Sequence, residues 1–203
     1  MAKLPQEKIL PFNDTSEKVF DYSKVEPFIG KSSPWREGHD IVTKSDIRHW
    51  CEVMRDGNPL YADEEYAKKS KYRGVIAPPT MAQAWSLEPM HSALRQFVNE
   101  IEPHPNDPHT QCFMECNKQG YSGVVATEQE QIYFNPIRPG DMISCQLTLH
   151  RVSTYDHFTR MGIGRYVDLK YTLKNQRDEV VCEMIFRVLK YKPTQTTWRA
   201  YKG

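Results

Sequence analysis

Residues 78–87, Pro-Pro-Thr-Met-Ala-Gln-Ala-Trp-Ser-Leu, are the stretch that decides the fold. Proline is well suited to the first turn of a helix, so Pro79 predicts that a helix begins here. The residues after it are apolar on most sides, which is typical of a buried helix. Downstream of this helix the hydrophobic period changes to two, which indicates strands. A buried helix followed by strands predicts an α+β domain.

Four stretches after the predicted helix show the alternation of half-buried strands. They are residues 124–134, 142–150, 166–173 and 180–191. Short turns join the last three, which predicts an antiparallel meander. We therefore expect an antiparallel sheet wrapped around the buried central helix.

Shorter helices are predicted upstream of this stretch. Residues 45–54 have apolar side chains at helical spacing after Ser45 and Asp46, which are good N-cap residues. Residues 63–70 have acids first and bases last, which complements a helix dipole. Residues 15–22 can begin a third short helix within a segment that prolines interrupt.

The length of 203 residues predicts a single domain, residues 1–203. We expect residues 1–38 to be an N-terminal extension and residues 87–120 to be an insertion after the central helix. The net charge of +1 gives no reason to expect nucleic acid or a membrane surface as a partner. No apolar run approaches the roughly 20 residues that span a bilayer. The N-terminus lacks an apolar signal region, so we expect a cytoplasmic protein.

Five cysteines lie at positions 51, 112, 116, 145 and 182. Their odd number and scattered spacing predict reduced thiols. The spacing of Cys112 and Cys116 relative to nearby histidines matches no standard zinc pattern, so we expect no metal site. We interpret these two residues as thiols in the insertion.

Residues 56–61 read Asp-Gly-Asn-Pro-Leu-Tyr, and residues 76–80 read Ile-Ala-Pro-Pro-Thr. Together they resemble the active-site segment of the MaoC-like (R)-specific enoyl-CoA hydratases and dehydratases, Asp-x-Asn-Pro-Ile-His followed by Ile-Ala-His-Gly. Residues 133–141 are similar to the turn that leads into the later strands of that family. The resemblance covers about residues 40–192 and implies a hot-dog fold. The Ala-Pro-Pro-Thr form is typical of the N-terminal MaoC-like subfamily, which includes non-catalytic halves of two-subunit dehydratases.

In catalytic members of that family an Asp and a His form the acid–base pair, and a backbone N–H stabilises the thioester oxyanion. Asp56 and Asn58 match the family residues, but Tyr61 replaces the His. A phenol with a pKa near ~10 is not a ready base at neutral pH. Pro79 replaces the family Gly, and proline has no backbone N–H. The resemblance therefore implies a retained scaffold that lacks both the base and the oxyanion donor.

The resulting hypothesis is a heteromeric enoyl-CoA hydratase or (R)-3-hydroxyacyl thioester dehydratase, a lyase of steroid or fatty acyl metabolism. This chain would shape the acyl pocket and would not be catalytic by itself. A second MaoC-like hot-dog subunit would supply the intact Asp/His pair. The substrate would be an acyl-CoA or acyl-carrier thioester, with no resident cofactor. The expected substrate-binding residues are Asn58, Pro79, Thr80, Met81, Trp85 and, for the CoA phosphates, Arg165.

Simpler roles remain open for these residues. Asp56 is equally suited to cap the turn that follows it. Tyr61 can be a packed aromatic residue, and Trp85 can belong to the core. Two other functions also remain open: an autonomous acyl-CoA hydratase that uses Asp56, and a non-catalytic acyl-CoA binding protein.

Overall fold

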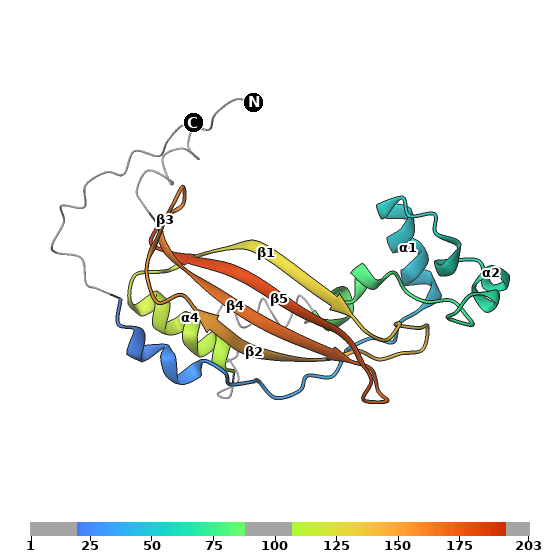
Figure 1. Cartoon of the computed structure of the whole chain (residues 1–203), viewed down its shortest axis with the longest axis horizontal. Coiled ribbons are helices and arrows are strands. Elements are labelled where there is room, and N and C mark those ends of the chain that lie inside the picture. The colour runs from blue at the N-terminus through green and yellow to red at the C-terminus, as the bar shows by residue number, and fades with distance from the viewer. Residues whose placement is uncertain (1–19, 88–106, 194–203) are drawn as a thin grey trace, which may run out of the picture.

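The computed structural model describes residues 20–87 and 107–193. Within these residues a five-stranded antiparallel sheet is the largest element, and helices lie at its two ends (Figure 1). No helix in these two ranges is long and apolar enough to cross a membrane.

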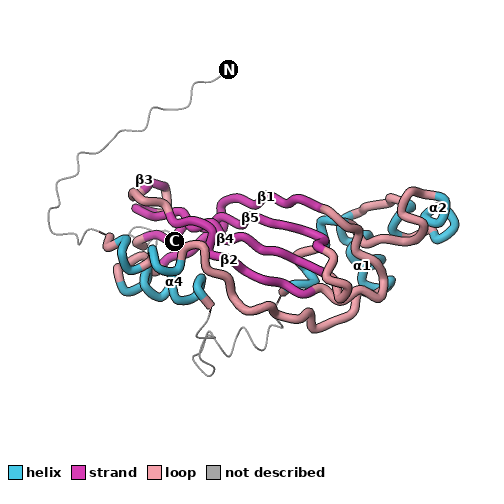
Figure 2. Tube along the Cα trace, turned by 60° about the horizontal axis from the view of Figure 1, so that its bottom comes forward, coloured by secondary structure: helices cyan, strands magenta, loops and turns pink. Residues whose placement is uncertain are grey.

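The sheet consists of β1 (Gly123–Tyr133), β2 (Ser144–Val152), β3 (His157–Thr159), β4 (Gly162–Lys174) and β5 (Val180–Tyr191). Its strand order is β1-β5-β4-β2, and the short β3 pairs with β4 (Figure 2). The predicted meander of β2, β4 and β5 is confirmed, because each pairs antiparallel with the next. The strand β3, which is only three residues long, was not predicted from the sequence.

One face of the sheet is apolar and holds the core. Alternate residues of β2, β4 and β5 lie on this inner face, as the period of two predicts. The core has two adjoining parts. The first contains Ile47, Ala77, Met81, Ile137, Ile143, Leu173 and Met184. The second contains Val25, Cys112, Cys116, Tyr121, Leu149 and Val167. The rings of Tyr171 and Phe186 contact both parts.

The N-terminal segment runs along the outer edge of β2. The Gly30 N–H donates to the Leu149 carbonyl at 2.8 Å, and the Ser33 N–H donates to the Leu147 carbonyl at 2.7 Å. Arg36 and Cys145 exchange two backbone hydrogen bonds. The described part of the expected extension, residues 20–38, thus covers a sheet edge and contributes to the core.

Helices α1 (Lys44–Met54) and α2 (Glu64–Lys69) lie together beyond one end of the sheet (Figure 1). Both predictions are confirmed to within one residue at each end. The cap of α1 differs, because the Thr43 hydroxyl accepts from the Asp46 N–H at 3.2 Å. The α2 cap is Asp63, whose carboxylate accepts from the Tyr66 N–H at 3.0 Å.

The prediction that one long helix begins at Pro79 was wrong. Two 3₁₀ turns, η4 (Pro79–Met81) and η5 (Ala84–Ser86), stand in its place. The hydroxyl and the N–H of Ser86 both bind the Gln83 carbonyl, and Arg36 donates to the Ser86 carbonyl at 2.6 Å. These contacts satisfy the backbone locally and end the turn. Most of the helix predicted at residues 15–22 lies outside the described residues, and the 3₁₀ turn η1 spans Tyr22–Lys24.

Residues 88–106 of the expected insertion lie outside the described residues, and the structure describes residues 107–120. They contain α4 (Pro108–Lys118), which packs on the inner face of the sheet beside η2 (Glu26–Phe28). Cys112 and Cys116 are completely buried there. Pro108 occupies the first turn of α4, where its missing N–H costs nothing. Pro108 therefore begins a core helix, which was not predicted from the sequence.

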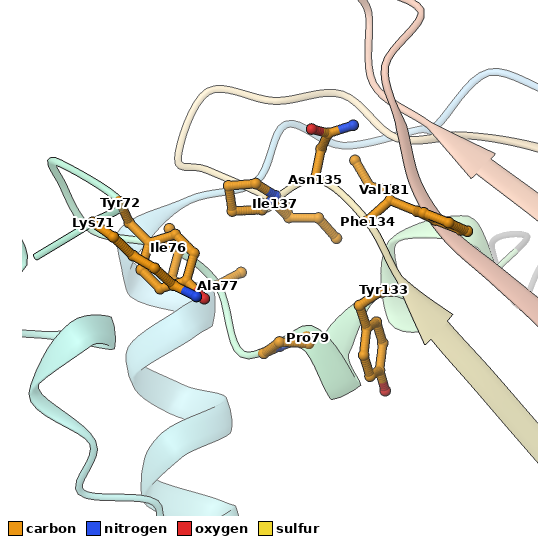
Figure 3. Close-up of a pocket in the computed structure, with 12 residues that line it drawn as sticks. Lys71, Tyr72, Ile76, Ala77, Pro79, Tyr133, Phe134, Asn135, Ile137 and Val181 are labelled. Atoms are coloured by element: carbon orange, nitrogen blue, oxygen red, sulfur yellow. The ribbon is translucent and has the colours of Figure 1, made fainter.

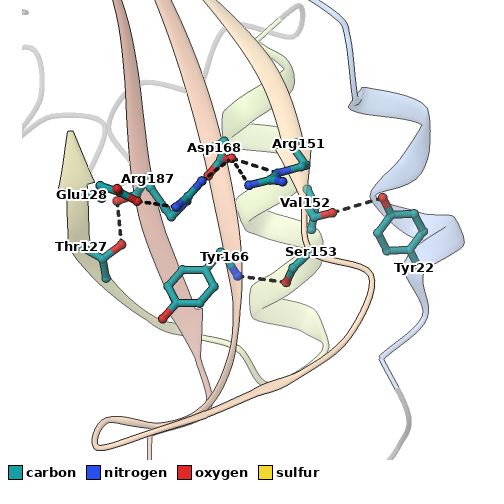
Figure 4. A network of polar contacts seen from close by, with 9 residues as sticks. All are labelled: Tyr22, Thr127, Glu128, Arg151, Val152, Ser153, Tyr166, Asp168 and Arg187. Carbon is teal, nitrogen blue, oxygen red and sulfur yellow. Dashed lines mark hydrogen bonds and ion pairs between the residues drawn. The ribbon is translucent and has the colours of Figure 1, made fainter. Parts of the chain in front are cut away.

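The opposite face of the sheet carries a row of charged side chains across all four main strands (Figure 4). Asp168 on β4 accepts hydrogen bonds from Arg151 on β2 and from Arg187 on β5. Arg187 also pairs with Glu128 on β1. Opposite charges at facing positions stabilise neighbouring strands, so this row helps to fix their register.

Candidate functional site

The turn after α1 holds the first of the predicted site residues. Arg55 ends the helix in the left-handed conformation, with φ of 54°. The Asp56 N–H then donates to the Cys51 carbonyl at 2.9 Å. The Asp56 carboxylate accepts from the Asn58 N–H at 3.1 Å and is exposed to solvent. The structure thus gives Asp56 the turn-capping contact expected of an Asp in this sequence.

Tyr61 closes the next turn, η3 (Pro59–Tyr61), and is half-buried. The Asn58 side chain caps this turn by accepting from the Leu60 N–H at 3.1 Å. Burial raises the pKa of Tyr61, and the nearby Asp56 carboxylate raises that pKa further. The phenol is therefore neutral at physiological pH. Asp56, Asn58 and Tyr61 are brought together as the sequence suggested.

A pocket of about 250 Å³ opens between this region and the end of β1 (Figure 3). Lys71 and Tyr72 line one side, and Tyr133 and Phe134 line the other. Pro79 lies between these two sides. Ile76 lines the pocket, and its N–H donates to the Leu60 carbonyl at 3.3 Å, so the segment that carries Asp56 and Tyr61 adjoins this pocket.

Backbone contacts hold the pocket walls in place. The Ala77 N–H donates to the Ile137 carbonyl at 2.8 Å, which joins the Ala-Pro-Pro segment to the turn after β1. The Arg138 side chain donates to the Tyr72 carbonyl at 2.6 Å, and its N–H donates to the buried Asp141 carboxylate. Residues 133–141, which carried the third part of the family resemblance, thus position this site.

A wider groove of about 1000 Å³ lies on the other side of η4 and η5. Met81, Trp85 and Trp50 contribute apolar surface to it. The indole N–H of Trp85 is buried and has no hydrogen-bond partner, the one such side-chain atom found in residues 20–87 and 107–193. An unpaired buried donor costs about 1–3 kcal/mol, which is unusual in a folded protein.

Two other predicted residues lie apart from the pocket. Thr80 is exposed at the surface of η4. Arg165 is only 5% exposed and lies at the α4 end of the molecule, over the Phe20 ring. Its guanidinium donates to Asp156 at 2.7 Å and to the Ser153 carbonyl. Arg165 is thus buried and already paired within the fold, and its contact with CoA phosphates stays a prediction.

Sequence reasoning missed the side chains that line most of the pocket. Lys71, Tyr72, Tyr133 and Phe134 were not expected as site residues. Phe134 and Tyr133 belong to the third family-like segment, so that segment was a signal for them. Lys71 and Tyr72 have no local signal, because only the folded chain brings them opposite β1.

A protein-family model described as the FAS1-like, dehydratase domain region matches residues 28–184. The chain belongs to this family. The chain is 34% identical over 179 residues to a curated relative, a probable enoyl-CoA hydratase alpha subunit of Thermomonospora curvata. That match covers 87% of this chain and 54% of the relative.

A second relative is the 3-oxo-4,17-pregnadiene-20-carboxyl-CoA hydratase alpha subunit of Mycobacterium tuberculosis, 32% identical with 81% of this chain and 49% of the relative covered. This FAS1-like dehydratase domain thus spans about half the length of the two relatives.

Solved structures confirm the hot-dog fold. A chain of the ChsH1-ChsH2 complex from Mycobacterium tuberculosis is similar with a TM-score of 0.72 and 29% identity, over 85% of this chain and 91% of that chain. A MaoC-like dehydratase from Rhodospirillum rubrum shares the fold at a TM-score of 0.51 and 19% identity, over 82% of this chain and 94% of that chain. The resemblance to MaoC-like proteins is therefore confirmed.

Proposed function

We propose that this chain is the pocket-shaping subunit of a two-subunit enoyl-CoA hydratase or (R)-3-hydroxyacyl thioester dehydratase. The observation that carries the proposal is Tyr61, a neutral phenol at the position where the catalytic family members have an imidazole base. A second MaoC-like hot-dog subunit would supply the Asp/His pair. Two relatives that are named alpha subunits, and a related structure that is a complex, support this arrangement.

The reaction requires a group that activates water and a group that protonates the carbon next to the thioester. The raised pKa of Tyr61 leaves no proton acceptor on that side chain at neutral pH. Asp56 is a carboxylate, but it accepts a hydrogen bond from the Asn58 N–H within its own turn. This local contact favours a structural role for Asp56 over a catalytic one.

The thioester oxygen also requires a donor where negative charge develops. Pro79 lines the pocket at the position of the family Gly, and its nitrogen carries no hydrogen. Two independent requirements of the reaction are therefore unmet at the two family positions. This supports a non-catalytic half more strongly than either substitution would alone.

The groove beside Met81 and Trp85 is the proposed wall for a bulky acyl group, such as a steroid side-chain thioester. Its size exceeds that of the pocket at Pro79 by about 750 Å³, the difference between 1000 and 250 Å³. Ile41, Val53 and Leu87 are 53%, 80% and 61% exposed in this part of the chain. Exposed apolar side chains beside a groove are typical of a surface that binds a ligand or a subunit.

The first test compares this chain alone with the chain co-expressed with its partner subunit. Hydration of a steroid enoyl-CoA and of crotonyl-CoA is followed by the loss of enoyl absorbance. We expect activity only in the complex. Full hydratase activity of the isolated chain would refute the proposal and favour the autonomous hydratase.

The second test changes Asp56 in the active complex. We expect Asp56→Asn to lower kcat/KM less than about 3-fold, because Asn retains the turn-capping oxygen. Asp21→Asn is the matched control, because the Asp21 carboxylate likewise accepts from the N–H two residues later, that of Ser23, at 3.1 Å and lies 40 residues before Tyr61 in the chain. A loss of several orders of magnitude at position 56 alone would establish a catalytic Asp56.

The third test addresses the acyl wall. Trp85→Ala in the complex is expected to raise KM for the steroid thioester at least about 10-fold more than KM for crotonyl-CoA, because only the bulky group reaches the groove. Equal effects on both substrates would contradict this assignment. Tight binding of thioesters by the isolated chain, without activity in any complex, would identify a binding protein instead.

A further inference from the structure

A further cavity lies on the inner face of the sheet, and it shares no lining residue with the pocket at Pro79 or the groove beside Trp85. Its volume is about 420 Å³. Cys145, Leu147 and Tyr171 of β2 and β4 form its base, and residues 33–36 and the start of α4 form its sides. This volume is in the range that holds small organic ligands.

The surface of this cavity is suited to a ring. Cys145 and Leu147 are 3% and 8% exposed, so the base is apolar and firmly packed. The Trp35 indole lines the cavity and is 39% exposed, and the Tyr171 ring is held edge-on against Phe186 at 6.5 Å. Two aromatic side chains and an aliphatic base give a flat ring a large contact area.

Tyr171 presents an unused polar group to this cavity. Its hydroxyl has no hydrogen bond to any residue that the structure describes. Cys145, Arg36 and Asp107, which influence the pKa of Tyr171, all line the same cavity. Burial raises the pKa of Tyr171 to about 12, so the hydroxyl stays neutral and can donate or accept.

His109 presents a second polar group. Its Nδ1 pairs with the Asp107 carboxylate, whose other oxygen accepts from the Thr110 hydroxyl at 2.9 Å. The imidazole also lies edge-on against Phe113 at 5.9 Å. Pairing with the carboxylate places the proton of a neutral imidazole on Nδ1, which leaves Nε2 as an acceptor. The one contact recorded for Nε2 is a long one, 3.4 Å from Thr110, whose hydroxyl already donates to Asp107.

We propose that this cavity binds a neutral, ring-containing alcohol or phenol, whose hydroxyl donates to His109 Nε2 and accepts from the Tyr171 hydroxyl. A hydroxyl group both donates and accepts, so it meets the acceptor on His109 and the donor on Tyr171 with a single atom. The ring occupies the space between Trp35 and the base of the cavity. This site needs neither a thioester nor a partner subunit, so it is independent of the function proposed above.

The experiment uses the full chain and two probes, 2-naphthol and 2-methoxynaphthalene, titrated at neutral pH by calorimetry. The methyl ether keeps the ring but cannot donate. We expect 2-naphthol to bind at least about 5-fold more tightly, the effect of one hydrogen bond. Equal affinity for the two probes, or binding of neither, would overturn the proposal.

Two variants locate the site, and both keep a ring while removing polar atoms. Tyr171→Phe and His109→Phe are each expected to weaken 2-naphthol binding about 5-fold. His109→Phe should leave the methyl ether unchanged, whereas Tyr171→Phe should weaken it too, because the ether oxygen can still accept from the Tyr171 hydroxyl. Tyr166→Phe is the matched control, because Tyr166 is on the same strand and does not line the cavity. Thermal unfolding confirms that each variant is folded. Wild-type affinity of both Tyr171→Phe and His109→Phe, or an equal loss in Tyr166→Phe, would overturn the assignment.

Discussion

Asp168 is the centre of the charged row on the outer face of the sheet, and its replacement tests how that row contributes to stability (Figure 4). Its carboxylate is 3% exposed. It accepts from Arg187 Nε at 2.6 Å and from Arg151 Nε at 3.0 Å, and each guanidinium adds a second contact. Asp168→Asn keeps the size of the side chain and removes its charge.

The expected cost follows from this burial. Removing one partner of a buried ion pair typically costs about 3–5 kcal/mol. The Arg151 and Arg187 side chains are 62% and 30% exposed, so water can replace part of the lost interaction. We therefore expect a loss of about 2–3 kcal/mol, which is at or below the lower limit of that range. For a chain of this size this corresponds to a decrease in Tm of about 4–12 °C.

The stability loss caused by Asp168→Asn should become smaller as the pH falls. Burial raises the pKa of Asp168, but hydrogen bonds and charge from Arg187 and Arg151 outweigh it and hold that pKa below its usual value. A depressed pKa in the folded state gives stability that is present above the unfolded pKa of about 3.9. That stability is lost as the pH falls below this value, so wild type and Asp168→Asn should converge in acid.

Urea unfolding at pH 7 and at several acidic pH values measures the difference in free energy. Asp178→Asn is the control, because Asp178 is 81% exposed in its ion pair with Lys174. An exposed pair contributes about 0–1 kcal/mol, so the control should be close to wild type. A loss at Asp168 no larger than that of the control, or a loss that does not change with pH, would refute this reasoning.

Three further outcomes are expected. Gly38→Ala should lower the free energy of unfolding by about 1–3 kcal/mol, because the added Cβ would lie 2.4 Å from the Ile143 carbonyl oxygen. Gly57→Ala is the control and should cost under about 1 kcal/mol, because the space beside Gly57 is open. Equal losses in the two variants would contradict this prediction. Tyr121 and Tyr171 should ionise only near pH 12, measured by phenolate absorbance, because burial raises the pKa of each to about 12. Since these folded pKa values exceed the unfolded value of about 10, stability from both should be complete below pH 10 and fall toward pH 12; an alkaline transition below pH 10 would argue against this. Cys112→Ser should cost about 1–3 kcal/mol by urea unfolding, since it buries a hydroxyl in the core, and a neutral effect would show that the hydroxyl finds a partner.

Local patterns were sufficient for the strands and the two exposed helices. The alternation along β2, β4 and β5 survives folding because each strand has one apolar and one polar face. Local patterns failed at Pro79 and Pro108. Both prolines can begin a helix or end one, and only packing decides: Pro79 begins a 3₁₀ turn, whereas Pro108 begins α4.

In the candidate site, too, local sequence patterns predicted one part and only packing decided the other. Asp56, Asn58 and Tyr61 lie within six residues of one another, so their proximity was predictable from one turn. The opposite wall of the pocket comes from β1, which is more than 70 residues later in the chain. No short-range pattern can report a contact that depends on how the sheet closes.

The sequence by itself determined the α+β class, the antiparallel meander and the family, because these depend on hydrophobic period and on short contiguous motifs. The tertiary structure decided that Cys112 and Cys116 are core residues and that Arg165 is buried. It also decided that Tyr171 and His109 share a cavity. These features depend on which faces of distant segments meet, and burial and charge pairing across that distance exist only after the chain has folded.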